Sequence, residues 1–294
     1  MTGRGGGEFS RRGFIGAASA LALIAPRSSG GKNVAGPPLK YHLFLPASDT
    51  PKPLLVLVHG VSTKPETLIE LLAVDAAEHG RPLMTPDFDD DVFDEYQRLG
   101  SSKAPLESAR ALVAALGQAF TRIGRPQAPV DLMGFSGGAQ FVHRFGLFFP
   151  KMVRRLVISS PGWYTWLDDK EPYPYGVAPS AQSENLTPDV AAFLRLPKLV
   201  TVGEDDTKRD VQLRTGRADA QGRTRLERAR HWVDHVNEQA ERRGGVRTRL
   251  EVLPNTPHSV TRAVRKGGLG RKMFNFLEGE APPVLPARAA GERP

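Results

Sequence analysis

The chain has 294 residues, of which 40% are hydrophobic, so it is long enough for one large domain with a buried core. It contains no cysteine, which excludes disulfides, thiolate metal sites and cysteine nucleophiles. Its formal net charge of +8 bears on solubility and steering rather than on fold. No apolar run reaches the roughly 18 residues that a bilayer requires, so we expect no membrane span.

The first residues have the pattern of an export signal. Arg11 and Arg12 stand just before Phe14 and Ile15, and a short, mostly apolar stretch at 16–25 ends at Pro26. A basic segment followed by a short apolar segment is typical of a secretory signal, and paired arginines are typical of the twin-arginine type. We therefore predict a twin-arginine signal peptide at 1–26, a linker at 27–38, recognition by the twin-arginine export machinery and a periplasmic or extracellular location.

From residue 39 onward, strand-like apolar runs alternate with helical patterns. The predicted strands are 54–58, 82–86, 130–133, 153–159, 198–202 and 247–253, and the predicted helices are 65–79, 105–123, 139–149, 224–243 and 269–277. This alternation predicts an α/β domain over 39–278, with a mostly parallel central sheet and helices on both faces. The Pro/Ala/Arg-rich segment 279–294 is expected to be a flexible tail.

A glycine-rich turn follows the predicted strand 130–133. Gly134-Phe135-Ser136-Gly137-Gly138 fits the G-x-S-x-G nucleophile elbow and lies between a buried strand and a helix. Such a turn requires small residues on both sides of the serine and lifts the hydroxyl above the sheet edge. We predict Ser136 as a nucleophile and the N–H of Gly137 as one oxyanion donor; the alternative is a structural turn with a capping serine.

The segment 162–196 interrupts the alternation between two predicted strands. It contains Trp163, Tyr164, Trp166, Tyr173 and Tyr175 and is punctuated by prolines. An excursion of this length with so many rings favours a cap over a site rather than a plain connector. We predict Trp163, Tyr164 and Trp166 as substrate-binding residues, which implies an apolar or aromatic part in the substrate.

A serine nucleophile needs a base, and the base needs an orienting carboxylate. Among seven histidines, His258 is the best placed, because it lies in a loop between the last predicted strand and the C-terminal helix. The carboxylate is expected after the strand 198–202, where Asp205 and Asp206 follow Gly203 and Glu204. The spacing alone does not choose between these two aspartates.

With these motifs in this order, residues 39–278 resemble the α/β-hydrolase superfamily. The resemblance implies Asp206 as the acid, because the acid commonly lies three residues past the glycine that ends this strand, and it leaves Asp205 as the rival. It also implies that Val61, directly after His59-Gly60, supplies the second oxyanion donor. The stretch 202–258 is similar to secreted esterases related to polyhydroxyalkanoate depolymerases and feruloyl esterases, many of which carry disulfides that this chain lacks.

Other polar clusters are interpreted as structural. His231 and His235 are four residues apart on a predicted helix, but the helix is very basic and offers no evident third metal ligand. The acidic stretch 87–95 lacks the glycine of a calcium loop and favours a solvated or substrate-facing loop. The basic stretch 208–230 lacks interleaved aromatic residues, so we expect no nucleic-acid partner.

Together these observations predict an exported serine hydrolase that cleaves carboxylic esters, small or polymeric, without cofactor or metal. The alternatives are amidase or thioesterase chemistry on the same three residues and a non-catalytic binding module on a hydrolase scaffold.

Overall fold

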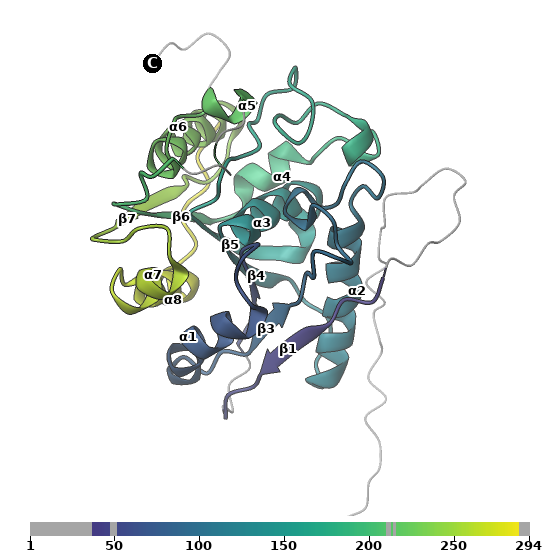
Figure 1. Ribbon diagram of the computed structural model, residues 1–294, viewed down its shortest axis with the longest axis vertical. Coiled ribbons are helices and arrows are strands. Elements are labelled where there is room, and N and C mark those ends of the chain that lie inside the picture. The colour runs from purple at the N-terminus through teal and green to yellow at the C-terminus, as the bar shows by residue number, and fades with distance from the viewer. Residues whose placement is uncertain (1–36, 48–51, 210–212, 214–215, 288–294) are drawn as a thin grey trace, which may run out of the picture. The chain divides into compact units, whose positions relative to one another are not determined.

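The apolar strands pair into one sheet, which forms the centre of the computed structural model (Figure 1). The structure describes residues 37–47, 52–209, 213 and 216–287, so the predicted signal peptide and most of the predicted linker lie outside the described residues. The seven strands lie in the order β1-β3-β2-β4-β5-β6-β7. Their bounds are β1 Tyr41–Phe44, β2 Leu55–Val58, β3 Leu83–Pro86, β4 Val130–Phe135, β5 Val153–Ser159, β6 Lys198–Gly203 and β7 Arg249–Leu253.

All neighbouring strands are parallel except the edge pair β1 and β3, which is antiparallel. The mostly parallel sheet predicted from the sequence is therefore confirmed. Strand β1 was not predicted, because it is a four-residue edge strand whose residues are all only partly buried, so it lacks the continuous apolar run of a central strand. In a parallel sheet the carboxyl ends of the strands share one edge, and β2, β4, β6 and β7 all end there.

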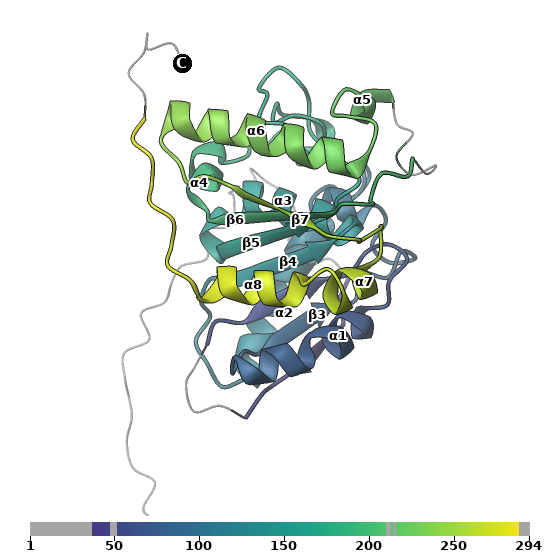
Figure 2. The same cartoon turned by 90° about the vertical axis from the view of Figure 1, so that its left-hand side faces the viewer.

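Helices cover both faces of the sheet, as Figures 1 and 2 show. The longer ones are α1 Pro65–Glu78, α2 Glu107–Arg122, α3 Gly137–Phe148, α6 Arg225–Arg243 and α8 Leu269–Glu278. Short helices are α4 Val190–Arg195, α5 Gly216–Asp219 and α7 Val260–Arg265, with single 3₁₀ turns η1 Tyr96–Arg98, η2 Pro150–Met152 and η3 Ala181–Ser183.

Successive strand residues point into two separate cores. Val56 and Val58 of β2 pack in the core that α2, α3 and α6 cover, whereas Leu55 and Leu57 pack in the core under α1, α7 and α8. This alternation follows from the two-residue period of a strand, and burial on both faces explains why the run 54–58 is apolar throughout. The two cores hold the strand ends rigidly, which positions the loops that follow them.

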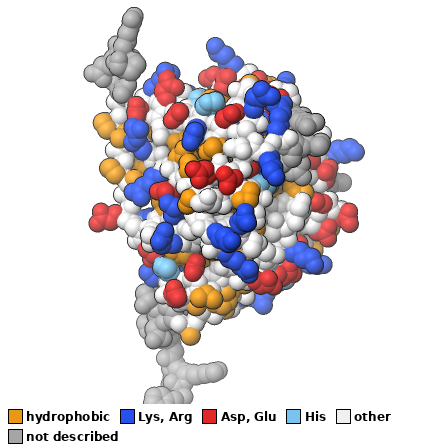
Figure 3. Space-filling view, turned by 60° about the vertical axis from the view of Figure 1, so that its left-hand side comes forward, with side chains coloured by type: hydrophobic (Ala, Val, Ile, Leu, Met, Phe, Trp, Pro, Cys, Tyr) orange, Lys and Arg blue, Asp and Glu red, His pale blue; other side chains and the backbone are white. Residues whose placement is uncertain are grey.

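Two further observations concern the surface. Val284 pairs with Val246 in an antiparallel bridge, and the Leu285 N–H donates to the Gly245 carbonyl, so part of the predicted flexible tail 279–294 is bound to the domain. On the face in Figure 3, acidic and basic side chains are interspersed, which spreads the net charge rather than gathering it by sign. Among the described residues, no helix is long and apolar enough to cross a membrane.

Candidate active site

Ser136 lies in a strained turn between β4 and α3. Its backbone has φ 55° and ψ −113°, a region that residues other than glycine adopt only when the surrounding structure imposes it. A Cβ atom on Gly134 would lie 2.1 Å from the Gly138 carbonyl oxygen, and one on Gly138 would lie 2.0 Å from the Val58 carbonyl oxygen. Only glycine fits at either position, so the turn has the close approach that the sequence motif requires.

His258 lies between Ser136 and Asp206. Its Nε2 is 3.0 Å from the Ser136 Oγ, and its Nδ1 is 2.8 Å from the Asp206 Oδ2. The Asp206 side chain is 1% exposed, whereas that of His258 is 26% exposed, so the carboxylate is enclosed and the imidazole faces the surface. The Phe135 ring stacks on the imidazole, with ring centres 5.1 Å apart, and holds it from the side.

The loops after β6 and β7 are joined by backbone contacts. The Asp205 N–H donates to the Thr256 carbonyl at 3.1 Å, and the Asn255 N–H donates to the Glu204 carboxylate at 3.1 Å. These bonds leave the Asp205 side chain exposed and turn that of Asp206 toward the imidazole. Of the two carboxylates between which the sequence does not choose, the structure brings Asp206 to His258.

The backbone of Val61 lies close to that of Gly137, the residue after Ser136. Gly137 is the first residue of α3, so its N–H has no acceptor within the helix, and a Cβ on Gly137 would lie 3.3 Å from the Val61 nitrogen. Val61 is 45% exposed. The two residues predicted as oxyanion donors are thus neighbours, and the positive end of the α3 dipole favours negative charge at this position.

Buried side chains hold the Val61 loop. The Tyr96 hydroxyl donates to the His59 carbonyl at 2.9 Å, and His59 Nε2 accepts from the Phe88 N–H at 3.1 Å. Burial lowers the pKa of His59, which keeps its ring neutral and able to accept. His59 therefore joins the loop after β2 to the loop after β3.

The aromatic residues after β5 pack against helices. The Tyr164 ring has no exposed surface and stacks on Trp232 of α6 with ring centres 4.6 Å apart. Trp163 is 4% exposed and lies between the Tyr175 ring and the Arg144 guanidinium. The rings of Tyr164 and Trp163 are enclosed by the protein itself, and the prediction that they contact substrate stays a prediction.

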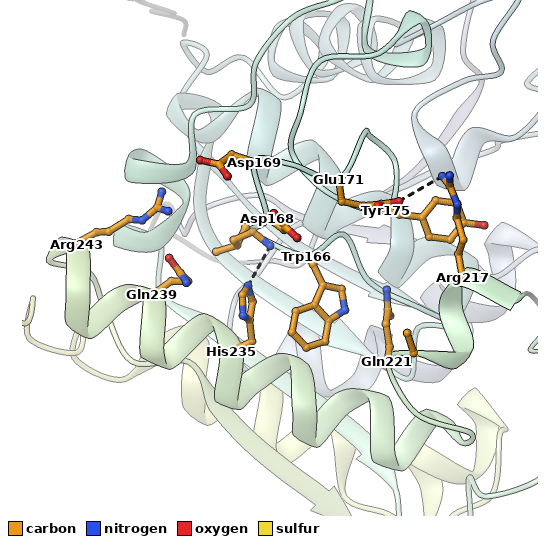
Figure 4. A pocket seen from close by; sticks show the side chains of 12 residues that line it. Trp166, Asp168, Asp169, Glu171, Tyr175, Arg217, Gln221, His235, Gln239 and Arg243 are labelled. Carbon is orange, nitrogen blue, oxygen red and sulfur yellow. Dashed lines mark hydrogen bonds and ion pairs between the residues drawn. The ribbon is translucent and has the colours of Figure 1, made fainter. Parts of the chain in front are cut away.

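Trp166 lines a pocket of about 650 Å³ beside α6 (Figure 4). Its ring packs against His235, and the wall is completed by polar and charged side chains that include Asp168, Arg217 and Gln239. Ser136 and His258 are not among the lining residues. The segment 162–196 therefore places its rings against α3 and α6 and in the wall of this pocket. The position of Trp166 gives no support to the prediction that it binds substrate.

The histidines considered as metal ligands bond to the backbone instead. His231 Nδ1 lies 3.0 Å from the Gln221 carbonyl oxygen, and His235 Nε2 accepts from the Leu167 N–H at 3.2 Å. Within the described ranges, no group of three histidine, aspartate or glutamate side chains is arranged to hold a metal ion.

One charged contact of the site was not predicted. Arg225, the first residue of α6, is 2% exposed, and its Nη1 lies 3.4 Å from the Asp206 Oδ1. Arg225 is 19 residues beyond Asp206 in a generally basic stretch, so nothing in the sequence distinguishes it from its exposed neighbours. Only the packing of α6 selects it.

Comparisons with known proteins agree with this architecture. No family model and no curated protein matches the chain. Among solved structures, a poly(aspartic acid) hydrolase from Sphingomonas sp. KT-1 is 25% identical with a TM-score of 0.66, covering 82% of this chain and 93% of that one. A poly(3-hydroxybutyrate) depolymerase from Bordetella parapertussis is 22% identical with a TM-score of 0.69, covering 85% and 87%.

Each likeness covers more than four fifths of this chain, which is enough to include most of the central sheet and its helices. The sequence resemblance is therefore confirmed at the level of the fold. The chain has the α/β-hydrolase fold.

Proposed function

We propose that the protein is a serine hydrolase that cleaves carboxylic esters through an acyl-enzyme. The observation that carries the proposal is the continuous contact from the Ser136 Oγ to His258 Nε2 at 3.0 Å and from His258 Nδ1 to Asp206 at 2.8 Å. Proton transfer and nucleophilic attack require such short distances between nucleophile, base and orienting acid.

In the first half-reaction, the Ser136 oxygen attacks the ester carbonyl while His258 takes the hydroxyl proton. Asp206 holds the ring in the tautomer that accepts at Nε2 and stabilises the imidazolium. The N–H groups of Gly137 and Val61 bind the oxyanion, and His258 returns its proton to the departing alcohol. In the second half-reaction, water attacks the acyl carbonyl while His258 takes its proton. The bond to the Ser136 oxygen then breaks, His258 returns the proton to that oxygen, and the acid leaves.

Substitution of the nucleophile tests the proposal. The Ser136→Ala variant is expected to lose labelling by a fluorophosphonate probe and to lose p-nitrophenyl ester hydrolysis by about 10⁵-fold or more. Ser259→Ala, which removes a hydroxyl next to His258 that caps α7, is the matched control and is expected to keep both activities. Labelling or full turnover by Ser136→Ala would refute the proposal.

Amide hydrolysis is the second candidate. It is favoured by the 25% identity to a poly(aspartic acid) hydrolase, because poly(aspartic acid) is a polyamide. The same three residues can serve both reactions, so the substrate panel decides: matched p-nitrophenyl esters and p-nitroanilides are assayed side by side. Faster turnover of the anilides relative to the esters would replace the ester proposal by amidase chemistry.

Export through the twin-arginine route is part of the proposal and rests on the sequence, since Arg11 and Arg12 lie outside the described residues. Replacement of both by lysine is expected to retain the protein in the cytoplasm. Fractionation of expressing cells measures this, and unchanged export of the double variant would contradict it.

A further inference from the structure

Arg225 is a buried cation whose position is set by the start of α6. Thr224 caps this helix by accepting from the Glu227 N–H at 3.1 Å, and the Glu227 carboxylate accepts from the Thr224 N–H at 3.3 Å. The reciprocal cap determines where the helix begins. It therefore determines that Arg225, at the first helical position, points inward with 2% of its surface exposed.

Arg225 and His258 occupy the two oxygens of one carboxylate. The Arg225 Nη1 is 3.4 Å from Asp206 Oδ1, and the His258 Nδ1 is 2.8 Å from Oδ2. Because Asp206 is 1% exposed, solvent does not compensate its charge, and a buried carboxylate needs a partner of opposite charge. A guanidinium serves this purpose well, because it stays protonated when buried.

We infer that Arg225 is a positioning residue for the proposed reaction: it holds the Asp206 carboxylate in the orientation that faces His258. This inference rests on the proposed function. Its physical basis is that the guanidinium and the imidazole contact opposite oxygens of one buried carboxylate, so removal of the guanidinium takes away the contact at Oδ1. A carboxylate with more freedom to turn orients the imidazole less well, which lowers turnover rather than substrate binding.

The other titratable groups around the pair are compatible with this assignment. Glu204, Asp205 and Lys208 belong to the Asp206 loop but are exposed, so solvent screens them. Burial, and to a lesser extent the Asp206 charge, raises the pKa of Tyr164 well above the ordinary value, so the Tyr164 hydroxyl stays neutral. Arg225 is the buried cation in direct contact with the carboxylate.

Arg228, one turn further along α6, provides a matched control. It is also buried, but it donates to the carbonyls of Gly162, Leu213 and Gly222 and pairs with Asp219. Its contacts are thus with the neighbouring loops. Replacing it is expected to lower stability while the folded variant keeps its kcat, which separates a structural effect of losing a buried arginine from the effect on the Asp206–His258 pair.

The experiment measures kcat and KM for p-nitrophenyl ester hydrolysis by the full-length protein and by Arg225→Gln, Arg225→Lys and Arg228→Gln, with folding checked by circular dichroism. Arg225→Lys keeps the charge but not the planar fork, so kcat is expected to fall by about threefold to tenfold. Arg225→Gln is expected to lower kcat further than Arg225→Lys does, at nearly constant KM.

An unchanged kcat in folded Arg225→Gln would overturn the inference, as would an equal fall in the kcat of folded Arg228→Gln. If Arg225→Gln does not fold, Arg225→Lys decides, since an unchanged kcat in that variant would refute the positioning role. Ser136→Ala, assayed in parallel, keeps the two failures apart: if it is inactive while Arg225→Gln has the kcat of the parent protein, the proposed function stands and only this inference fails.

Discussion

The two ends of strand β4 use buried charge in opposite ways. At the amino end, Asp131 is fully buried, and its Oδ2 accepts from both Arg81 and Arg154 at 2.5 Å. At the carboxyl end, the strand leads into Ser136, and the nearby Asp206 faces one arginine on one side and a half-open imidazole on the other. Strand β4 thus has a closed ionic cluster at its amino end. At its carboxyl end it leads to Ser136, whose partner His258 is partly exposed.

The amino-end cluster ties α8 to the sheet. Arg81 also pairs with Glu278, the last residue of α8, and Arg154 and Arg155 donate to the carbonyls of Leu277 and Phe276. These donors satisfy the C-terminal carbonyls of the helix, which have no partners within it. Burial raises the pKa of Asp131, and the two arginines oppose that effect.

The difference teaches that burial of a carboxylate does not by itself indicate catalysis. The side-chain partners that the structure gives Asp131 are Arg81 and Arg154, neither of which is a nucleophile or a general base. Asp206 has a titratable ring beside it, and that ring reaches a hydroxyl at 3.0 Å. We therefore expect substitutions at the carboxyl end to affect turnover, and substitutions at the amino end to affect stability.

The largest expected effect is that of Asp206→Asn. Loss of the charge that orients and stabilises His258 is expected to lower kcat by about 10⁴-fold, measured on p-nitrophenyl esters. The control is Asp205→Asn, whose exposed carboxylate does not face the imidazole and whose kcat should stay within about threefold of the parent. An inactive Asp205→Asn beside an active Asp206→Asn would reverse the assignment.

At the other end of the strand, Asp131→Asn is expected to lower the free energy of unfolding by about 3 kcal/mol, because it leaves Arg81 and Arg154 without their shared counter-charge. Urea unfolding followed by tryptophan fluorescence measures the loss. The kcat of the folded variant should remain that of the parent. A large fall in kcat with unchanged stability would break the contrast between the two ends.

The pH dependence of stability sharpens the comparison, because α3 also carries a buried titratable ring. Burial lowers the pKa of His143 well below its usual value, and its Nε2 accepts from the Thr165 N–H. Below about pH 6.5 the unfolded chain therefore binds a proton that the folded chain does not, so stability that is present above this pH is lost on acidification.

Between pH 7.5 and 5.5, the parent protein should lose about 1.4 kcal/mol more unfolding free energy than His143→Gln, as measured by urea titration at the two pH values. The comparison uses the change in unfolding free energy between the two pH values, so the pH-independent destabilisation caused by the substitution itself cancels. Equal slopes would mean that His143 does not supply this pH dependence.

The smallest effect is expected at an exposed pair. Glu238 and Arg242, four residues apart on α6, form an ion pair with more than half of each side chain exposed. Glu238→Gln should change the unfolding free energy by less than about 0.5 kcal/mol, because solvent screens the pair. The same urea assay measures it, and a loss comparable to that of Asp131→Asn would show that burial is not what distinguishes the amino-end cluster.

Several features could be predicted from the sequence because they depend on neighbours along the chain. The unbroken run at 54–58 indicates a strand with two covered faces, and the glycines around Ser136 indicate a turn that excludes side chains. The short helix α7 was not predicted because six residues are too few to establish a helical period. The edge strand β1 was not predicted because its partly buried residues do not form the continuous apolar run of a central strand.

The aromatic segment shows what its sequence pattern leaves open. Trp163 and Tyr164 have the composition of a substrate-facing cap, yet their rings pack on Tyr175 and Trp232. Large rings gain more from contact with one another and with α6 than from exposure, and the sequence does not state which surface they meet.

By itself the sequence determined the alternation of strands and helices, the identity of the turn that presents Ser136, and the position of His258 after the last strand. Only the tertiary structure decided that Asp206 rather than Asp205 faces the imidazole and that Arg225 lies behind it. The physical reason is one of range: periodicity and turn geometry are set by adjacent residues, whereas the contacts of Asp206 join loops 19 and 52 residues apart, and these meet only when the helices pack on the sheet.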